Sequence, residues 1–396
     1  MLNEYQKFSG NPLDWRKDPV QTKIMFQKSF NILAKKDYSG ISPNVFVGRF
    51  GYPKVNVGFL STQEIYENND NVPFWVKEQY PINKIIGLRT HLINSVFKAD
   101  IKSFNDRFLQ MSQEVAMAQK PVDMEISLAK KPVFSLSFNQ EAAPHGPKVE
   151  LEKAMLTGNP RIPLPVEKVV SDTDLKSVEA LKYLAGKGFD EYSMVKLLSI
   201  GTLGLKKNRR LVPTRWSITA VDDTLGKKLI AQVKDMEVVS SFTVFYGSHL
   251  GNYYIVLLCP NMWSYELFEM YFKSPRYTTD HESFFGRKGY AENTAGGYYS
   301  VRLGILEGLS AMKIQGAAFV LRFITDEYFA PLGVWVTREA ARKAMQNRIK
   351  ECSTLKEALD FILEFAKNRF NYDASPQIRK SVLLNEIMAQ KRLSEY

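Results

Sequence analysis

Apolar and polar positions alternate with the two-residue period of strands in some segments and recur with the period of helices in others. Neither period dominates the chain. The runs 45–48 and 55–60 are rich in β-forming residues and flank a turn with Gly51 and Pro53, which predicts a hairpin with a loop longer than two residues. A second hairpin is predicted where "SFTVFYG" and "NYYIVLLC" flank "SHLG". Because strands and helices mix without strict β–α–β alternation, we expect an α+β fold with a mixed or antiparallel sheet packed against helices.

The second half of the chain carries further segments with a clear period. We expect helices for "MWSYELFEMYF" and "YYSVRLGILEGLSAM", and strands for "GAAFVLRFI" and "LGVWVTRE". From about residue 338 the apolar positions recur at helical spacing, which predicts a helical C-terminal region.

The segment "NRRLVPTRWSITAVDD", residues 208–223, concentrates polar chemistry in a short stretch. Trp216, Ile218 and Ala220 alternate, which predicts a strand, and Asp222 or Asp223 would then serve as N-cap of a following helix. A tryptophan in an alternating strand faces a core more often than a ligand, so we expect Trp216 to be buried. The alternative is that Trp216 is a platform on which a base stacks.

The charge balance favours an anionic partner. The chain has 53 Lys and Arg against 42 Asp and Glu, a net charge of +11, and nucleic acid is the commonest partner of such a protein. The two cysteines and four histidines lack the spacing of a zinc site. Two cysteines in a chain of this length do not suggest a disulfide scaffold, so we expect a cytoplasmic protein. No apolar run approaches the roughly 18 residues that span a bilayer, so we expect no membrane contact.

Several cations are candidates for phosphate contact, because a guanidinium group matches phosphate oxygens in a bidentate way. Arg209, Arg210 and Arg215 lie in the segment 208–223, with the alternative that they follow a helix end where cations are favoured. Arg49 and Lys54, with Tyr52, lie in or beside the loop of the first hairpin, which suits a binding loop.

Paired glycines in "NTAGGYYSVRLG" precede a helix. They would let backbone N–H groups approach an anion, or they would allow close packing of the helix. Arg302 follows Tyr298 by one turn and would share its face.

Four carboxylates could hold Mg²⁺ if the fold brings them together: Asp222, Asp223, Asp280 and Glu282. Arg287 or Arg302 would then stabilise negative charge. The alternative for Asp280 and Glu282 is a solvated loop with a local salt bridge. No cofactor follows from the sequence itself, and Mg²⁺ belongs only to this enzymatic alternative.

The peptide "QKRLSEY" has a recognisable spacing. Gln390, Leu393 and Tyr396 follow the pattern Gln-x-x-aliphatic-x-x-aromatic, with which peptides dock onto sliding clamps on a single helical turn. The usual pattern has a second aromatic residue, which this peptide lacks.

Five segments together resemble the archaeal Nre family: "NVFVGRFGYPKVNVG", "RIPLPVEKVVSD", "LLSIGTLGLKKNRRLVPTRWSITAVDD", "DHESFFGRKGYAENTAGGYYSVRLGILE" and "PLGVWVTREAAR". The resemblance implies a DNA repair protein that binds the sliding clamp PCNA through the peptide at residues 390–396. Many family members carry a cysteine-rich N-terminal element that has no counterpart before Cys259 here. We expect a lead-in (1–40), an N-terminal region (41–280), a C-terminal region (281–374) and a final helix with the clamp-binding peptide (375–396).

The leading hypothesis is therefore a DNA repair factor that binds DNA and is recruited by PCNA, with other repair proteins as further partners. The residues expected to contact DNA phosphates are Arg49, Lys54, Arg209, Arg210, Arg215, Arg287 and Arg302. One alternative is a metal-dependent enzyme acting on damaged DNA or a nucleotide. Another is a repair adaptor that does not bind DNA.

Overall fold

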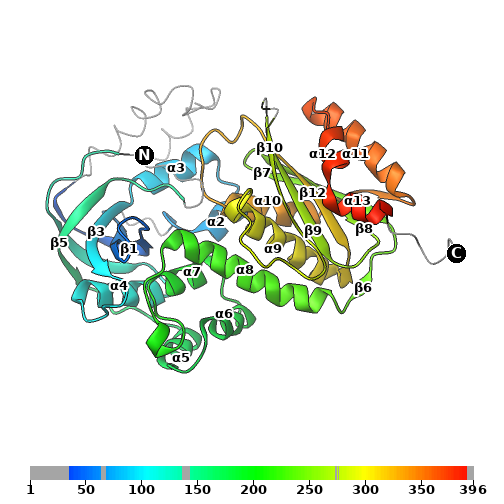
Figure 1. Cartoon of the computed structure of the whole chain (residues 1–396). Helices are drawn as coiled ribbons and strands as arrows, with labels where there is room; N and C mark the ends of the chain where they lie inside the picture. Colours follow the sequence, from blue (N-terminus) through cyan, green and yellow to red (C-terminus); the bar gives the residue numbers. More distant parts are fainter. Residues whose placement is uncertain (1–34, 64–67, 136–142, 273, 275, 390–396) are drawn as a thin grey trace. The chain divides into compact units, whose positions relative to one another are not determined.

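The structure is a computed structural model that describes residues 35–63, 68–135, 143–272, 274 and 276–389 (Figure 1). The chain forms two compact units, one of residues 1–225 with 329–333 and the other of residues 226–328 with 334–396. We call them the barrel unit and the sheet unit and describe each by itself. Helices and mixed sheets together confirm the predicted α+β class. Ile24, Phe26, Phe30 and Leu33 lie near one helical face in the sequence, which predicts a helix, and this segment lies outside the described residues.

Five strands of the barrel unit close into a barrel in the order β1-β2-β3-β5-β4. Neighbouring strands are antiparallel except β3 and β5, which run parallel. Val45, Val57 and Phe59 are buried and point to the barrel interior, as alternation along a barrel strand requires. The strands are β1 (Asp37–Val47), β2 (Lys54–Thr62), β3 (Ile93–Asp100), β4 (Val122–Leu128) and β5 (Lys148–Leu156).

This strand order, with a helix between β3 and β4, is that of the five-stranded Greek-key OB-fold barrel. The helix is α4 (Arg107–Met117), and the Asp106 carboxylate caps it by accepting a hydrogen bond from the Leu109 amide at 2.9 Å. The pairing of β1 with β2 confirms the first predicted hairpin. Its connecting loop, residues 48–53, is called the β1–β2 loop below.

Further helices of the barrel unit flank the barrel or follow it in the chain. They are α2 (Val72–Lys77), α3 (Ile82–Thr90), α5 (Leu164–Ser171), α6 (Ser177–Gly186), α7 (Glu191–Ser199), the 3₁₀ turn η2 (Lys206–Asn208) and α8 (Thr214–Val233), within which the two units divide.

The strand predicted at residues 216–220 is wrong, because these residues lie in α8. The Pro213 carbonyl accepts hydrogen bonds from the Trp216 and Ser217 amides at 2.8 and 3.0 Å, as in a first helical turn. In so short a window, alternate residues also satisfy helical spacing, since positions 216 and 220 share a helix face. The predicted capping role of Asp222 or Asp223 is wrong for the same reason, because both lie inside the helix.

The sheet unit is built on six strands in the order β10-β9-β12-β8-β7-β13. The β9–β12 pair is parallel and the other neighbours are antiparallel. A separate parallel pair joins β6 and β11. The strands are β6 (Glu237–Val238), β7 (Phe242–His249), β8 (Asn252–Cys259), β9 (Ser264–Tyr271), β10 (Tyr277–Glu282), β11 (Ile314–Gln315), β12 (Ala317–Ile324) and β13 (Arg348–Cys352).

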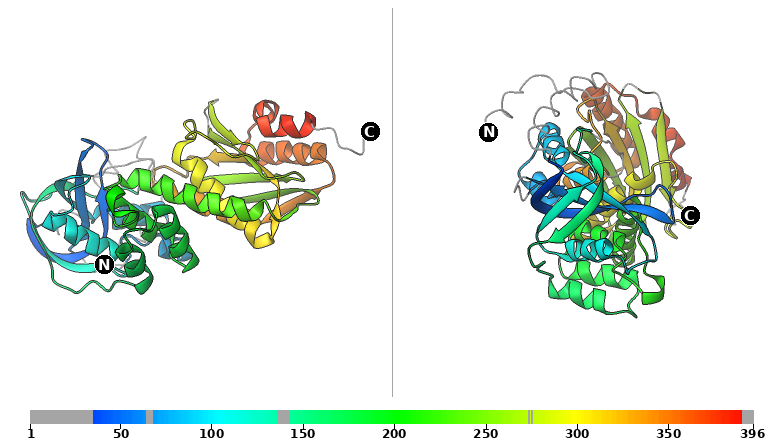
Figure 2. Two further views of the ribbon diagram at one scale, coloured as in Figure 1. Left: turned by 60° about the horizontal axis from the view of Figure 1, so that its bottom comes forward. Right: turned by 90° about the vertical axis from the view of Figure 1, so that its left-hand side faces the viewer.

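Helices cover both faces of this sheet, so the unit has three layers (Figure 1, Figure 2). One apolar core joins the sheet to α9 (Ala295–Met312) and α10 (Trp335–Met345). The other joins the opposite face to α11 (Leu355–Phe370), α12 (Ser375–Lys380) and α13 (Val382–Ala389). Among the described residues, no helix combines the length and apolarity needed to cross a membrane.

Two element predictions for the sheet unit are wrong. "MWSYELFEMYF" forms strand β9 and not a helix, and "LGVWVTRE" leads into helix α10 and not a strand. Strand β9 is buried on both sides, because Tyr265 and Leu267 face one core while Phe268 and Met270 face the other. A strand buried on both faces loses the alternation that separates it from a helix. The β7–β8 hairpin, helix α9 and strand β12 confirm the other predictions.

Candidate nucleic-acid interface

Two segments that are far apart in the chain lie side by side in the barrel unit, namely the β1–β2 loop and residues 211–216. The Val47 amide donates to Thr214 Oγ1 at 2.9 Å, where β1 enters the loop. At the other end of the loop, the Ile101 amide donates to the Pro53 carbonyl at 3.1 Å, and the Leu211 amide donates to the Ile101 carbonyl at 2.8 Å. These bonds hold the start of α8 against the loop.

Aromatic side chains gather at this junction. The Tyr52 and Trp216 rings are in contact, with centroids 5.7 Å apart and planes at 51°. Trp216 is 47% exposed, so the expectation that it is buried is wrong. The reason is that it lies in the first turn of α8 and not in a strand with an inner face. Among the described residues of the barrel unit, the exposed large aromatic side chains are Phe50, Tyr52 and Trp216, all at this junction.

Cationic side chains accompany these rings. Arg49, Lys54 and Arg210 are exposed, and Arg215 is half-buried beside Trp216. The Arg49 guanidinium carbon lies 5.0 Å from the centre of the Phe50 ring, a cation–π contact. Four of the seven cations predicted to contact phosphate therefore lie in or next to these two contacting segments. We call them, with Phe50, Tyr52 and Trp216, the aromatic–basic patch.

Arg209 has a different role from its neighbour Arg210. Its Nε donates to the Gly204 carbonyl at 2.8 Å, and its Nη2 donates to the carbonyls of Val170 and Asp172 at 2.8 and 3.0 Å. Burial lowers the pKa of its guanidinium from the ordinary value. Arg209 thus ties the end of α5 to the segment that leads into α8, and its donors are engaged within the fold.

Arg302 and Glu282 form a buried ion pair in the sheet unit. Arg302 Nη1 lies 2.7 Å from Glu282 Oε2, and both side chains are almost fully buried. Trp263 Nε1 also donates to Glu282, at 3.3 Å. The predicted pairing of Arg302 with Tyr298 on one face is confirmed, with the guanidinium carbon 5.6 Å from the ring centre. Arg302 is therefore buried inside the fold and is not exposed for contact with a phosphate group.

Asp280 of strand β10 and Arg287, which follows this strand in the chain, form a second ion pair. Arg287 Nη1 lies 3.1 Å from Asp280 Oδ1 and 3.0 Å from the His281 carbonyl. Asp280 Oδ2 accepts two further hydrogen bonds, from the Thr294 amide and hydroxyl, both at 2.8 Å. The salt bridge expected as the alternative reading of this loop is therefore present, although Asp280 is buried and not solvated.

Among the described residues, the four predicted carboxylates do not gather in a metal-binding group. Asp280 and Glu282 each have a guanidinium partner, while Asp222 is buried and Asp223 half-buried on α8. In the part of the chain that the structure describes, no three His, Cys, Asp or Glu side chains gather in a group that could hold a metal ion.

The glycine pair lies within the first turn of α9 and serves close packing. A Cβ added at Gly297 would lie 2.9 Å from Glu269 Oε1, a distance that real Cβ contacts do not reach. Glu269 in turn pairs with Arg322 inside the unit. The Glu269 carboxylate therefore lies beside the start of α9, where the alternative expectation would have placed an anionic ligand.

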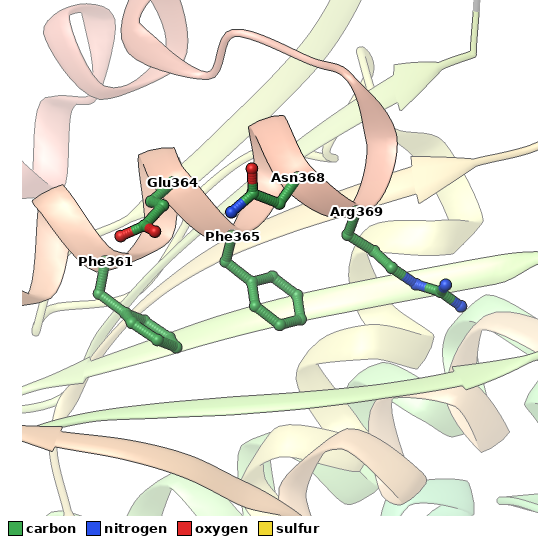
Figure 3. Close-up of a pocket in the computed structure, with 5 residues that line it drawn as sticks. All are labelled: Phe361, Glu364, Phe365, Asn368 and Arg369. Carbon is green, nitrogen blue, oxygen red and sulfur yellow. The ribbon is translucent and has the colours of Figure 1, made fainter.

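A pocket of about 330 Å³ lies on the sheet unit against α11 (Figure 3). Its lining residues are Phe361, Glu364, Phe365, Asn368 and Arg369, all on one helix. Figure 3 shows both phenylalanine rings projecting from the same side of α11, and their rings pack against the core beneath. With one carboxylate and one guanidinium, this lining does not supply the paired acid and base of a hydrolytic site.

Sequence reasoning missed one residue of the aromatic–basic patch, Phe50, and one cation on the neighbouring barrel surface, Lys98. Phe50 was not singled out, although its place between Arg49 and Gly51 in a turn is a signal for exposure. Lys98 lies exposed on β3 between buried Phe97 and Ala99, opposite Asn56 of β2, so strand alternation could have placed it on the outer face. The predicted clamp-binding residues Gln390, Leu393 and Tyr396 lie outside the described residues.

Comparisons with known proteins cover nearly the whole chain. Residues 16–278 match the family model for the N-terminal region of archaeal Nre proteins, and residues 282–396 match the model for the C-terminal region. These regions meet near residue 280, whereas the two compact units divide within α8. No solved structure matches the chain.

Curated relatives are 34–38% identical to the chain over the aligned residues. "DNA repair protein NreA" of Haloferax volcanii is 38% identical over 364 residues, which is 86% of each chain. "DNA repair protein NreB" of Archaeoglobus fulgidus is 37% identical over 367 residues, covering 89% of this chain and 90% of the relative. "DNA repair protein NreA" of A. fulgidus is 34% identical, over 87% and 88% of the two chains. The chain belongs to the archaeal Nre family.

Proposed function

We propose that this protein is a DNA repair factor that binds DNA through the aromatic–basic patch and is recruited by the sliding clamp PCNA. The names of its relatives support the repair role. The observation that carries the DNA-binding role is that Arg49, Lys54, Arg210 and Arg215 lie in or next to the two contacting segments that carry the exposed aromatic rings.

Phosphate contacts explain the chemistry of these cations. Arginine forks and the lysine ammonium bind phosphate oxygens, and each contact releases a counterion from DNA. The affinity should therefore fall as salt rises, with a slope set by the number of contacts. The net charge of +11 adds a general attraction that speeds the encounter.

The test is DNA affinity measured over a range of salt concentrations for the wild type and for Arg49→Ala, Lys54→Ala, Arg210→Ala and Arg215→Ala. Each loss should weaken binding and reduce the slope of log affinity against log salt by about 0.7 to 0.9 per contact. Arg348→Ala is a matched control, because Arg348 is exposed and paired with Glu351 in the sheet unit. If all four variants keep both the wild-type affinity and slope, the assignment of the patch is wrong.

The clamp contact is proposed for the peptide QKRLSEY, residues 390–396. Gln390 would enter a polar pocket on the clamp, while Leu393 and Tyr396 would fill an apolar one. Deletion of residues 390–396, or Tyr396→Ala, should abolish binding to PCNA and leave the melting temperature unchanged. Lys391→Ala is the matched control, because it falls between the anchor positions. A large loss of melting temperature on deletion would mean that these residues belong to the core.

The two alternatives predict different results in the same assays. An adaptor that does not bind DNA would show no affinity for DNA even at low salt. A metal-dependent enzyme would turn over DNA or nucleotide with Mg²⁺ or Mn²⁺ and lose this activity with Asp223→Ala. No observation among the described residues favours the enzyme, since Asp280 and Glu282 are each held by a guanidinium group.

A further inference from the structure

We infer that the aromatic–basic patch binds single-stranded DNA by stacking unpaired bases on Trp216 and Tyr52. This inference rests on the DNA binding proposed above and specifies the form of DNA that the patch takes. Phosphate contacts alone would not need aromatic rings, whereas unpaired bases offer faces that can stack on them.

The exposure of the rings is the first argument. Phe50 is 76% exposed, Tyr52 44% and Trp216 47%, and all three lie on the β1–β2 loop or the first turn of α8. Large aromatic side chains in water lose the free energy that burial would provide. A group of them at one junction, in a unit whose other described large aromatics are wholly or partly buried, marks a binding surface.

The loop that carries these rings is held in one shape before any ligand arrives. Gly51 has φ of +84°, and its carbonyl accepts a hydrogen bond from the Lys54 amide at 2.8 Å. A Cβ at this position would lie 2.7 Å from the Lys54 carbonyl oxygen, so the turn requires glycine. Because Val47 and Pro53 are also bonded to neighbouring segments, the rings form a preorganised platform that costs little ordering on binding.

The barrel surface continues the patch. Lys54 and Lys98 are exposed on the outer faces of β2 and β3, with half-buried Asn56 between them in the register. Asp100 lies opposite Lys54, and its carboxylate accepts a hydrogen bond from the Lys102 amide at 3.0 Å. In OB-fold barrels the face of strands 2 and 3 and the loop between strands 1 and 2 bind oligonucleotides. By analogy with these barrels, the β1–β2 loop with Phe50 and Tyr52 and the exposed Lys54 and Lys98 of β2 and β3 correspond to that binding face.

A single strand fits this surface better than a duplex. Bases within a duplex are stacked on one another and cannot offer their faces to Trp216. Each nucleotide of an unpaired strand offers one base that can stack on a ring and one phosphate that can contact a cation. This chemistry matches a surface on which rings lie next to cations. Binding to a single-stranded region would suit a factor that acts where the duplex has been opened.

The test uses the full chain with a labelled oligothymidylate of about 16 nucleotides, a duplex of the same length and a matched RNA strand. Affinities are measured by fluorescence anisotropy. The wild type should bind the single strand more tightly than the duplex. Trp216→Ala and Tyr52→Ala should each weaken single-strand binding roughly 5- to 100-fold, while Trp216→Phe and Tyr52→Phe, which keep a ring, should retain most of it.

Two controls separate stacking from a general loss of structure or charge. Phe285→Ala removes a 93% exposed aromatic from the sheet unit and should leave the affinity unchanged. Saturation with oligothymidylate should quench a component of the tryptophan fluorescence that is missing in Trp216→Phe. Trp75, Trp263 and Trp335 are buried, and the comparison is made in a Trp15→Phe background because Trp15 lies outside the described residues.

The outcomes distinguish this inference from the proposed function. Equal or tighter binding of the duplex, with no effect of Trp216→Ala or Tyr52→Ala, would overturn the inference and leave DNA binding standing. Tighter binding of RNA would overturn the choice of DNA. Absence of binding to either form of DNA at low salt would overturn both the inference and the DNA-binding part of the proposed function.

Discussion

Tyr52 and Trp216 are in contact at 5.7 Å between ring centroids, although one belongs to the β1–β2 loop and the other to the first turn of α8. The contact joins a barrel loop to a helix that begins more than 150 residues later in the chain. Both rings keep nearly half of their surface exposed. The Tyr52–Trp216 contact therefore connects two distant segments of the chain, and both rings remain accessible to a ligand.

The first prediction concerns the energy of this link. Tyr52→Ala and Trp216→Ala should each lower the free energy of unfolding, and the double variant should lose less than the two single losses together, by about 0.5 to 1 kcal/mol. The reason is that either single change already removes the ring contact. Urea unfolding of the four proteins gives the coupling. Tyr52→Phe keeps the ring and should preserve it, whereas strictly additive losses would show that the contact contributes nothing.

The second prediction separates structural arginines from those of the patch. Arg302→Ala leaves Glu282 buried without its cation, so the free energy of unfolding should fall by roughly 3 to 5 kcal/mol. The measurement is thermal unfolding, alongside DNA affinity of the protein that remains folded. Arg210→Ala, at an exposed residue, should show the reverse, with weaker DNA binding and little change in melting temperature. Weaker DNA binding by Arg302→Ala at an unchanged melting temperature would place Arg302 in the interface instead.

The third prediction tests the close packing of α9 against α10 in the sheet unit. A Cβ at Gly308 would lie 2.6 Å from the Met345 Cβ, so Gly308→Ala forces the helices apart and should cost about 1 to 3 kcal/mol of stability. Gly186→Ala is the matched control, because nothing lies within 4 Å of its added Cβ at the end of α6. That change should be neutral or stabilise by up to about 1 kcal/mol. Equal effects of the two changes in urea unfolding would contradict the packing argument.

Local patterns predicted the elements that depend on neighbouring residues. The β1–β2 and β7–β8 hairpins join adjacent strands, and α9 has a long apolar period, so these were found. Barrel closure was not, because β1 must pair with β4 and β3 with β5, and no local pattern specifies such distant partners. Strand β9 was mistaken for a helix because a strand buried on both faces does not alternate.

The candidate site was visible only in parts. Arg49, Tyr52 and Lys54 were singled out in the loop, and Arg210, Arg215 and Trp216 in a separate segment. Their proximity depends on the bonds from Val47 to Thr214 and from Leu211 through Ile101 to Pro53, which join residues distant in the chain. Burial likewise separates Arg302 from the exposed cations, and burial is a property of the whole fold.

The last prediction concerns pH and the buried His249. Burial lowers the pKa of its imidazole to about 4, and the Lys343 ammonium, 3.0 Å from Nδ1, acts in the same direction. In the unfolded chain a histidine has a pKa near 6.5. As pH falls from about 6.5 to about 4, the unfolded state therefore takes up a proton that the folded state does not, and stability is lost across this window.

The size of this loss can be measured by urea unfolding at about pH 7.5 and about pH 4.5. For His249 alone it should be on the order of 3 kcal/mol, and His249→Asn should flatten the profile by that amount because it removes the titrating group. Burial also lowers the pKa of His145 in the barrel unit to about 4, so His145→Asn should flatten the profile similarly. A profile of His249→Asn that coincides with the wild type would show that the imidazole is protonated in the folded state.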